Sequence, residues 1–322
     1  MTSPISGIHH VTAIAGDPQT NVDFYAGVLG LRLVKKTVNF DDPSTYHLYY
    51  GDGLGSPGTL MTFFPWPGAR RGSLGSGQTR TTAFAVPEDS LDFWRRRFDG
   101  AGIRVDDIER FGVEGLAFSD PDGLRLELLA SVKPDDDRRP WAGSSTPADH
   151  AIHGLDGVTF LHADSTASQR LLVEVMGFRQ IAVDGDRARY ASGTGGSGTF
   201  VDLVRDPSAA PGRVAGGSVH HVAFRVEDDP AQAAWMDRLF AAGHPTTDVK
   251  DRQYFHSIYF REPGGVLFEL ATDNPGFAVD EPVEALGRGL QLPPWLEPSR
   301  SRIERLLPDL DVSREREAGE AA

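Results

Sequence analysis

Hydrophobic and polar positions follow one arrangement four times along the chain. Each time an apolar strand is followed by a polar helix start, an amphipathic helix that ends in glycine, and further strands. The first strands of the four segments lie at residues 7–12, 81–86, 155–160 and 219–224. Because a period of about 50 to 60 residues indicates a repeated supersecondary unit, we interpret the chain as four β-α-β-β-β modules.

The boundaries inside each module carry their own signals. Asp17-Pro18 and Asp229-Pro230 are helix starts, since aspartate caps the first amides and proline suits the first turn. A glycine precedes the last strand of every module, at Gly58, Gly123, Gly198 and Gly265. These signals predict the same order of elements in all four copies.

One such module cannot bury a curved sheet by itself, so the modules should pair. The predicted fold class is α+β: four βαβββ modules paired into two similar halves, with curved mixed sheets that form a cavity for a metal. We expect modules 1 and 2 in an N-terminal domain at 1–135 and modules 3 and 4 in a C-terminal domain at 150–275. The polar stretch 133–140 connects them. A C-terminal extension, 276–322, is predicted to be partly helical, around 298–307, and then disordered.

Composition narrows the chemistry that this fold can support. The 322 residues include 32 basic and 46 acidic side chains, a net charge of −14, and no cysteine. Any metal must therefore be held by nitrogen and oxygen ligands, without thiolates. The acidic balance and the lack of a basic run argue against a nucleic-acid partner. No membrane-length apolar segment and no secretory signal are evident, so a cytoplasmic location is expected.

Comparison of the copies singles out three residues. Alternation places His221 on the side of its strand opposite Val222, and His10 takes the corresponding side in module 1. Glu269 lies in the otherwise apolar strand 266–271, where a carboxylate is unfavourable unless it is paired or binds a metal. Two imidazoles and one carboxylate suit non-haem Fe(II) with open positions for substrate and O₂. We therefore predict that His10, His221 and Glu269 are metal ligands.

The other two modules lack this set. Their equivalent positions hold Thr81 and Gly157 in the first strands, and Glu127 and Asp202 in the last. Two carboxylates without imidazole make a poor transition-metal site. We expect one metal per chain, with Glu127 as a structural or salt-bridged remnant.

Three motifs carry a family resemblance: GIHHVT at 7–12, VHHVAF at 219–224 and PGGVLFE at 263–269. With the four modules, they resemble the vicinal oxygen chelate superfamily, and within it the hydroquinone-type ring-cleaving dioxygenases, over nearly the whole span 7–273. The resemblance implies that module 1 faces module 4 and that His10, His221 and Glu269 hold Fe(II), with Mn(II) as the alternative. It implies a small aromatic diol and O₂ as reactants, and an open-ring product that contains both oxygen atoms.

The same resemblance implies further site residues. Tyr259 and Arg252 match an active-site tyrosine and arginine of the branch. His256 is a candidate proton carrier, because histidine titrates near neutral pH. Thr12, His9 and His220 are expected around the substrate. Alternation alone, however, points His9 and His220 away from the metal face.

Two other functions stay open. Glyoxalase I has a fourth protein ligand and catalyses a metal-dependent isomerisation without redox chemistry; its fourth position corresponds here to Thr62, whose hydroxyl is a weak ligand. The second alternative is a non-enzymatic protein of the same fold that binds a small molecule. A homo-oligomer is compatible with the sequence. Five aromatic residues are more typical of core packing than of a pocket wall: Tyr46, Tyr49, Phe63, Phe64 and Trp66.

Overall fold

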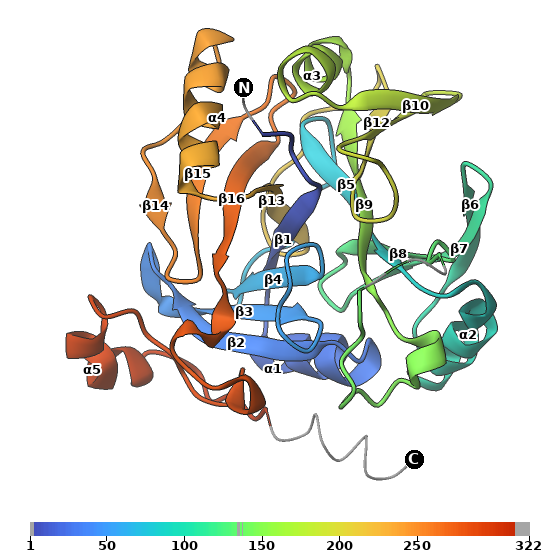
Figure 1. The fold of residues 1–322 in the computed structure, drawn as a ribbon. Coiled ribbons are helices and arrows are strands. Elements are labelled where there is room, and N and C mark those ends of the chain that lie inside the picture. The colour runs from blue at the N-terminus through green and yellow to red at the C-terminus, as the bar shows by residue number, and fades with distance from the viewer. Residues whose placement is uncertain (1–2, 134–135, 137, 313–322) are drawn as a thin grey trace.

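The computed structural model describes residues 3–133, 136 and 138–312. They form four consecutive modules, each a strand, a helix and three further strands (Figure 1). Module 1 contains β1 (Ile8–Ala15), α1 (Pro18–Val22), β2 (Arg32–Asn39), β3 (Asp42–Gly51) and β4 (Leu60–Pro65). Module 2 contains β5 (Gln78–Ala85), α2 (Leu91–Gly100), β6 (Asp106–Arg110), β7 (Val113–Ser119) and β8 (Arg125–Leu129). Module 3 contains β9 (Gly154–His162), α3 (Thr166–Arg170), β10 (Arg179–Asp184), β11 (Arg187–Ala191) and β12 (Phe200–Arg205). Module 4 contains β13 (Ser218–Val226), α4 (Asp229–Ala241), β14 (Lys250–Asp251), β15 (Phe255–Arg261) and β16 (Leu267–Pro275).

Short helical turns complete the modules and follow them. Two π-helical turns, η1 (Asp23–Val28) and η4 (Leu171–Val175), continue α1 and α3. The 3₁₀ turns are η2 (Glu88–Ser90), η3 (Ala148–His150), η5 (Phe277–Val279), η6 (Val283–Ala285) and η7 (Glu297–Ser299).

The predicted helix starts are present, with one shift. Asp17 caps α1, where its carboxylate accepts a hydrogen bond from the amide of Thr20 at 2.8 Å. α4 begins at Asp229, and Asp228 supplies the cap by accepting from the amide of Ala231 at 2.9 Å. The cap therefore lies one residue before the predicted one, which leaves the carboxylate of Asp229 available for another contact.

The modules pair into two eight-stranded mixed sheets. The first has the order β14-β15-β16-β13-β1-β4-β3-β2 and joins modules 4 and 1. The second has the order β10-β11-β12-β9-β5-β8-β7-β6 and joins modules 3 and 2. In each sheet the first strands of the two modules run antiparallel at the centre, β1 beside β13 and β5 beside β9. The predicted fold class is confirmed.

The two sheets take their modules from opposite ends of the chain. Each contains one module from before the connection at 133–140 and one from after it. The two halves in space therefore do not follow the order of the modules along the chain. Modules 1 and 4 share one sheet, as the resemblance implied, and modules 2 and 3 share the other. The chain boundaries at 135 and 150 stay a prediction.

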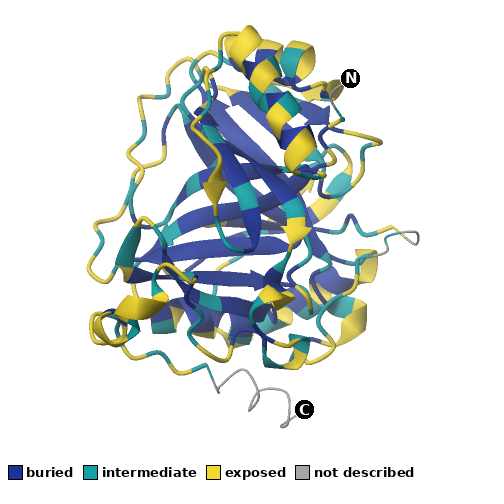
Figure 2. Ribbon diagram, turned by 60° about the vertical axis from the view of Figure 1, so that its left-hand side comes forward, coloured by how far each residue is buried: buried dark blue, intermediate teal, exposed yellow. Residues whose placement is uncertain are grey.

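A shared apolar core supports both sheets. It is built from the buried side chains of both, and the rings of Phe160 in β9 and Phe268 in β16 lie 5.3 Å apart across it. Figure 2 shows buried strands in the interior, while exposed residues concentrate on helices and loops. This rigid support is what holds side chains of different strands in fixed positions.

The segment after β16 packs along module 1. It contains α5 (Arg300–Glu304), whose Ile303 is buried against Val38 and Leu292. This helix lies within the predicted helical stretch. The disorder predicted for the end of the chain concerns residues 313–322, which lie outside the described residues. Among the described helices, none combines the length and the apolarity needed to cross a bilayer.

Candidate metal centre

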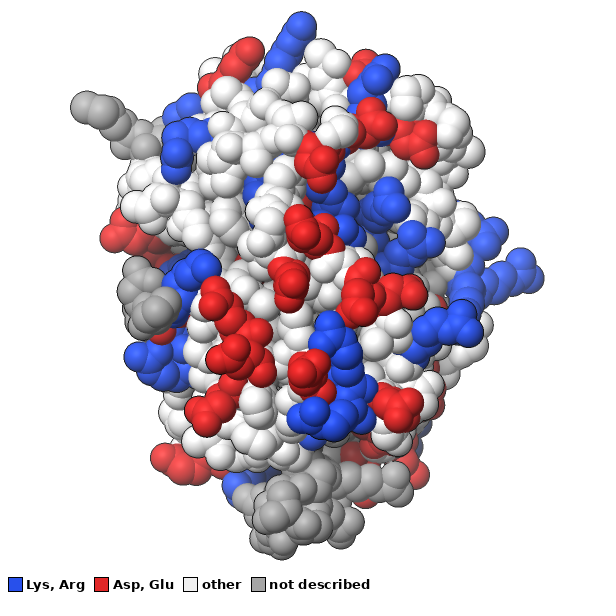
Figure 3. All heavy atoms as spheres, turned by 90° about the vertical axis from the view of Figure 1, so that its right-hand side faces the viewer, with Lys and Arg blue, Asp and Glu red and all other residues white. Residues whose placement is uncertain are grey.

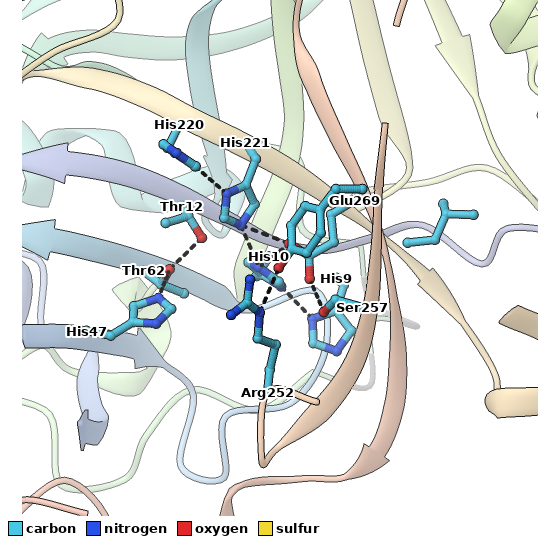
Figure 4. Close-up of polar contacts among 12 residues, drawn as sticks. His9, His10, Thr12, His47, Thr62, His220, His221, Arg252, Ser257 and Glu269 are labelled. Carbon is cyan, nitrogen blue, oxygen red and sulfur yellow. Dashed lines mark hydrogen bonds and ion pairs between the residues drawn. The ribbon is translucent and has the colours of Figure 1, made fainter. Parts of the chain in front are cut away.

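Three buried side chains of the first sheet converge on one point. The ligating atoms of His10, His221 and Glu269 all lie within 4.8 Å of one another. Nε2 of His221 is 2.9 Å from Oε2 of Glu269, and Nε2 of His10 is 3.4 Å from the same oxygen. The two Nε2 atoms are 3.3 Å apart. Figure 4 shows the three side chains pointing toward one another from β1, β13 and β16.

The central strands place these residues by their register. His10 and His221 lie on the adjacent antiparallel strands β1 and β13, and Ala223, two residues after His221, is paired with Glu269 in parallel β16. Residues two apart on a strand share a face. The carboxylate therefore reaches the same side of the sheet as both imidazoles.

Irregular pairing explains how two successive histidines reach the site from each strand. Between Ile8 and His10 the pairing of β1 with β13 slips by one residue, which leaves His9 unmatched. A second slip leaves His220 unmatched in β13. A bulge breaks strict alternation and redirects a side chain. As a result, Nδ1 of His9 lies 2.9 Å from Nδ1 of His10, and Nδ1 of His220 lies 2.8 Å from Nδ1 of His221.

These contacts leave the Nε2 atoms free to serve as ligands. A histidine that binds a metal through Nε2 needs a partner for its Nδ1–H, and that partner sets tautomer and ring orientation. Burial, and then His10, lower the pKa of His9 well below its ordinary value. Burial, and then His221, lower that of His220 to about 3. Both rings are therefore neutral at physiological pH and can accept such a hydrogen bond.

Glu269 is held as a buried anion. Burial by itself raises its pKa, but His10 and His221 together hold the pKa well below the ordinary value. The hydroxyl of Ser257 on β15 donates to Oε1, while Oε2 is buried, faces the Nε2 atoms of His10 and His221, and has no hydrogen bond of regular geometry to a described residue. A buried carboxylate oxygen of this kind is unfavourable unless a cation is nearby. The residues therefore fit a divalent metal.

Thr62 occupies the fourth position around this point. It pairs with Thr12 in parallel β4 and β1, two residues after His10, as Glu269 pairs two residues after His221. Its hydroxyl lies 2.7 Å from that of Thr12 and 3.0 Å from Nε2 of His47. The fourth side of the site thus carries a neutral hydroxyl that is already engaged in hydrogen bonds.

Arg252 and Tyr259 lie beside the three candidate ligands. Tyr259 is paired with Glu269 across β15 and β16, and its ring centre is 5.7 Å from that of His221. Nε of Arg252 donates to its hydroxyl at 3.2 Å, and Nη1 of Arg252 is 2.9 Å from Oδ2 of Asp41. Burial and the charge of Glu269 raise the pKa of Tyr259, so this hydroxyl stays protonated.

His256 is not brought to this site. It lies between Phe255 and Ser257 on β15, and its Nδ1 is 2.6 Å from Oδ1 of Asp229 on α4. Alternation along β15 turns Ser257 toward Glu269 and His256 toward the helix. The predicted proton carrier therefore lies on the far side of the sheet from the ligands.

A cavity of about 250 Å³ opens in front of the candidate ligands. Aromatic side chains form much of its wall, including Tyr49, Phe64 and Trp66, which sequence reasoning assigned to the core. Its lining consists of His10, Asn39, Phe40, Asp41, His47, Tyr49, Phe64, Trp66, His220, His221, Arg252, Phe255, Tyr259 and Leu267. A larger cavity of about 540 Å³ lies against the second sheet. The first is the candidate active site, because it alone adjoins the three converging donors found among the described residues.

His47 was missed by the sequence analysis. It lines the cavity, and the hydroxyl of Tyr49 lies 2.7 Å from its Nδ1. Burial lowers the pKa of His47 well below its ordinary value. The signal was present in the alternation of residues 45–51, which turns His47 and Tyr49 to one face and Leu48 to the other.

Comparison with known proteins places this geometry in a family. The model of the glyoxalase/bleomycin resistance protein/dioxygenase superfamily matches residues 7–128 and 154–270. The chain belongs to this superfamily. The two matched segments end shortly before the connection and resume after it, and together they contain His10, His221 and Glu269. The family prediction is confirmed.

Members of the superfamily from two bacteria match almost end to end. A Bacillus subtilis (strain 168) protein named as a ring-cleaving dioxygenase, MhqO, is 46% identical over 96% of this chain and 98% of its own. The chlorohydroquinone/hydroquinone 1,2-dioxygenase of Sphingobium indicum is 36% identical over 95% and 97%. A crystal structure of a Bacillus subtilis protein described as a dioxygenase covers 96% of this chain and 99% of its own, at 45% identity and a TM-score of 0.91.

A more distant superfamily member shows the fold alone. Glyoxalase I from Zea mays superposes with a TM-score of 0.62 over 83% of this chain, at 14% identity. The relatives at 36–46% identity, in contrast, are named as ring-cleaving dioxygenases, a class of oxidoreductase, in agreement with the prediction from the sequence.

Proposed function

We propose that this chain is a metal-dependent ring-cleaving dioxygenase that opens hydroquinones or related aromatic diols with O₂. The observation that carries the proposal is the convergence of His10, His221 and Glu269 in front of an aromatic cavity, with Thr62 in place of a fourth ligand. The proposed metal is Fe(II), with Mn(II) as the alternative. Two imidazoles and one carboxylate are a ligand set that these ions accept while keeping exchangeable positions.

The three candidate ligands determine the net charge of the metal centre. Two neutral imidazoles and one carboxylate neutralise only part of a dication, so the centre would favour an ionised phenol oxygen. When bound, the metal would supply a common site for the diol and O₂. Substrate and O₂ would thus meet at reacting distance without a protein nucleophile.

The surrounding side chains would bind and orient the diol. Tyr49, Phe64 and Trp66 line the cavity, where their rings would pack against a planar substrate. Arg252 would attract the ionised oxygen, and its hydrogen bond to Tyr259 fixes where that hydroxyl points. Thr12 would act through Thr62, and His9 and His220 would orient the ligand imidazoles.

The names of the relatives support the substrate class. The Sphingobium indicum relative is named for chlorohydroquinone and hydroquinone, and the match spans both sheets.

The glyoxalase-type alternative is disfavoured by Thr62, because a neutral hydroxyl replaces the carboxylate that a four-ligand site needs. A cytoplasmic location and a homo-oligomer stay predictions.

Elemental analysis and O₂ uptake together test the proposal. Protein purified without oxygen should contain about one iron or manganese per chain and should consume O₂ with hydroquinone after loading with Fe(II). The His221→Ala variant should lose metal and activity, whereas His244→Ala, outside the site, should keep both. Metal-loaded protein that consumes no O₂ with a panel of hydroquinones and catechols would refute the function. Thiol-dependent turnover of methylglyoxal without O₂ would select the isomerase, and tight binding of an aromatic ligand by metal-free protein would select the binding protein.

A further inference from the structure

The second sheet repeats the backbone of the metal centre with different side chains. Ala83 pairs with Glu127 in β5 and β8, as Ala223 pairs with Glu269 in β13 and β16. Thr81, two residues before Ala83, therefore stands where His221 stands in the first sheet. The pairing of β5 with β9 also slips between Thr79 and Thr81, which leaves Arg80 unmatched, as His220 is in β13.

We call the part of the second sheet that corresponds to the metal centre, around Thr81, Glu127 and Asp202, the cradle. Its two carboxylates are already paired. Oε1 of Glu127 accepts from Nη2 of Arg110 at 2.6 Å, as expected for a salt-bridged remnant. Asp202 binds Arg187 and Arg189, with 2.8 Å between the closest atoms of each pair. Thr81 and Gly157 stand where the first sheet has its two candidate ligand histidines, and the nearby arginines repel cations.

The cradle holds more positive charge than its carboxylates neutralise. In the described part of the chain, neither Arg80 nor Arg125 has a carboxylate within 4.0 Å. Burial, and then the charges of Arg187, Arg125 and Arg110, lower the pKa of Arg80. Five arginines thus accompany two carboxylates. Glu127 binds Arg110, Asp202 binds Arg187 and Arg189, and Arg80 and Arg125 are left without a carboxylate partner among the described residues.

A cavity of about 540 Å³ opens at these arginines. Arg80, Arg104, Arg110 and Arg125 line it together with the apolar side chains of Ile103 and Phe118. Thr81 also lines it, and its buried hydroxyl has no hydrogen-bond partner among the residues that the structure describes. Figure 3 views the side of the molecule that carries β6 and β10, where Lys and Arg side chains gather beside Asp and Glu.

Three acidic residues, Asp106, Asp120 and Glu127, also line the cavity, so its four arginines leave an excess of one positive charge. Glu127 is bound by Arg110. Asp120 accepts hydrogen bonds from the hydroxyl of Tyr25 and the amides of Asp122 and Leu124. Asp106 is exposed to solvent at the edge of the sheet.

We propose that this cavity, which we call the arginine cavity, binds a small organic carboxylate with a planar apolar body. Guanidinium groups match a carboxylate geometrically and by charge, and Thr81 adds a hydroxyl without a partner. Ile103 and Phe118 would cover the apolar body. The site is separate from the metal centre, since it is built on the other sheet, and it does not depend on the proposed dioxygenase activity.

Isothermal titration calorimetry tests this with the metal-loaded protein. Benzoate and cis,cis-muconate are the probes, and inorganic phosphate is an anion without an apolar body. We expect one benzoate or muconate per chain and weaker binding of phosphate. Arg80→Gln and Thr81→Val should each weaken binding, the first by about tenfold because it removes a charged hydrogen-bond donor. Arg95→Gln is the matched control, since Arg95 is paired at the surface with Asp92 and Asp107.

Further variants keep the test decisive. Arg80→Lys should restore part of the affinity. If Arg80→Gln is too unstable to titrate, Arg125→Gln takes its place. The metal content of all these variants should equal that of the unchanged protein. No saturable binding of benzoate or muconate up to about 10 mM would overturn the proposal, as would equal affinity in Arg80→Gln. Phosphate binding tighter than both carboxylates would overturn the assigned ligand class.

Discussion

Thr62 and Glu269 occupy equivalent positions in the two modules that share the first sheet. Each lies on the last strand of its module and pairs with the residue two positions after the candidate ligand histidine. One position supplies a carboxylate to the candidate metal centre, while the other supplies a hydroxyl bound to Thr12 and His47. This asymmetry leaves one side of the centre without a strong protein ligand.

A carboxylate at residue 62 should close that side. In Thr62→Glu we expect metal to be retained and ring cleavage to fall by about 100-fold, because the added ligand competes with substrate and O₂. Metal content and O₂ uptake with hydroquinone measure the two effects. Thr62→Ser keeps the hydroxyl and should stay active. Full activity in a metal-loaded Thr62→Glu protein would show that this position is not open to ligands.

Ser257 should tune the affinity for the metal. Its hydroxyl donates to Oε1 of Glu269, and this bond fixes the carboxylate so that Oε2 faces the two imidazoles. In Ser257→Ala we expect metal affinity to fall by about tenfold, as for loss of other partners that orient metal ligands. Competition with a chromophoric chelator measures the affinity. Ser208→Ala, at an exposed turn, is the control, and equal affinity of the two variants would contradict the role.

Arg252 should contribute to substrate binding more than to stability. It lines the cavity, donates to Tyr259 and pairs with the exposed Asp41. In Arg252→Gln we expect KM for hydroquinone to rise by about tenfold, because a charged partner of the phenol oxygen is lost. Arg252→Lys keeps the charge without the planar fork, so it should recover part of the affinity. Steady-state kinetics separate KM from kcat, and an unchanged KM in Arg252→Gln would reject this role.

Asp120 should make stability depend on pH. Burial raises its pKa from 3.8 to about 6. Between these values the folded protein holds a proton that the unfolded chain releases, so the free energy of unfolding falls as pH rises through the interval. The change attributable to Asp120 is at most about 3 kcal/mol.

Urea unfolding at pH 4 and pH 7 tests this, with Asp120→Asn as the comparison. Groups that titrate in both proteins cancel in the difference, so the unchanged protein should lose more stability toward pH 7 than the variant. Parallel pH profiles of the two proteins would disprove the contribution of Asp120.

Several features of this protein follow from local patterns in the chain. The four modules are visible because alternation and helix periodicity depend only on neighbouring residues. His10, His221 and Glu269 could be selected because the modules are copies, so a polar residue at an apolar position stands out. Their convergence needed only the correct faces and the pairing of modules 1 and 4, which the family resemblance supplied.

The tertiary structure alone decided which neighbouring side chains share the site. Strict alternation turned His9 and His220 away, but unmatched residues in the central strands bring both beside the ligands. The faces of the sheet likewise separate His256, which meets Asp229, from Ser257, which meets Glu269. A bulge depends on how two distant strands pair, and the burial of a face depends on what packs over it. Neither property is written in the local sequence of one strand.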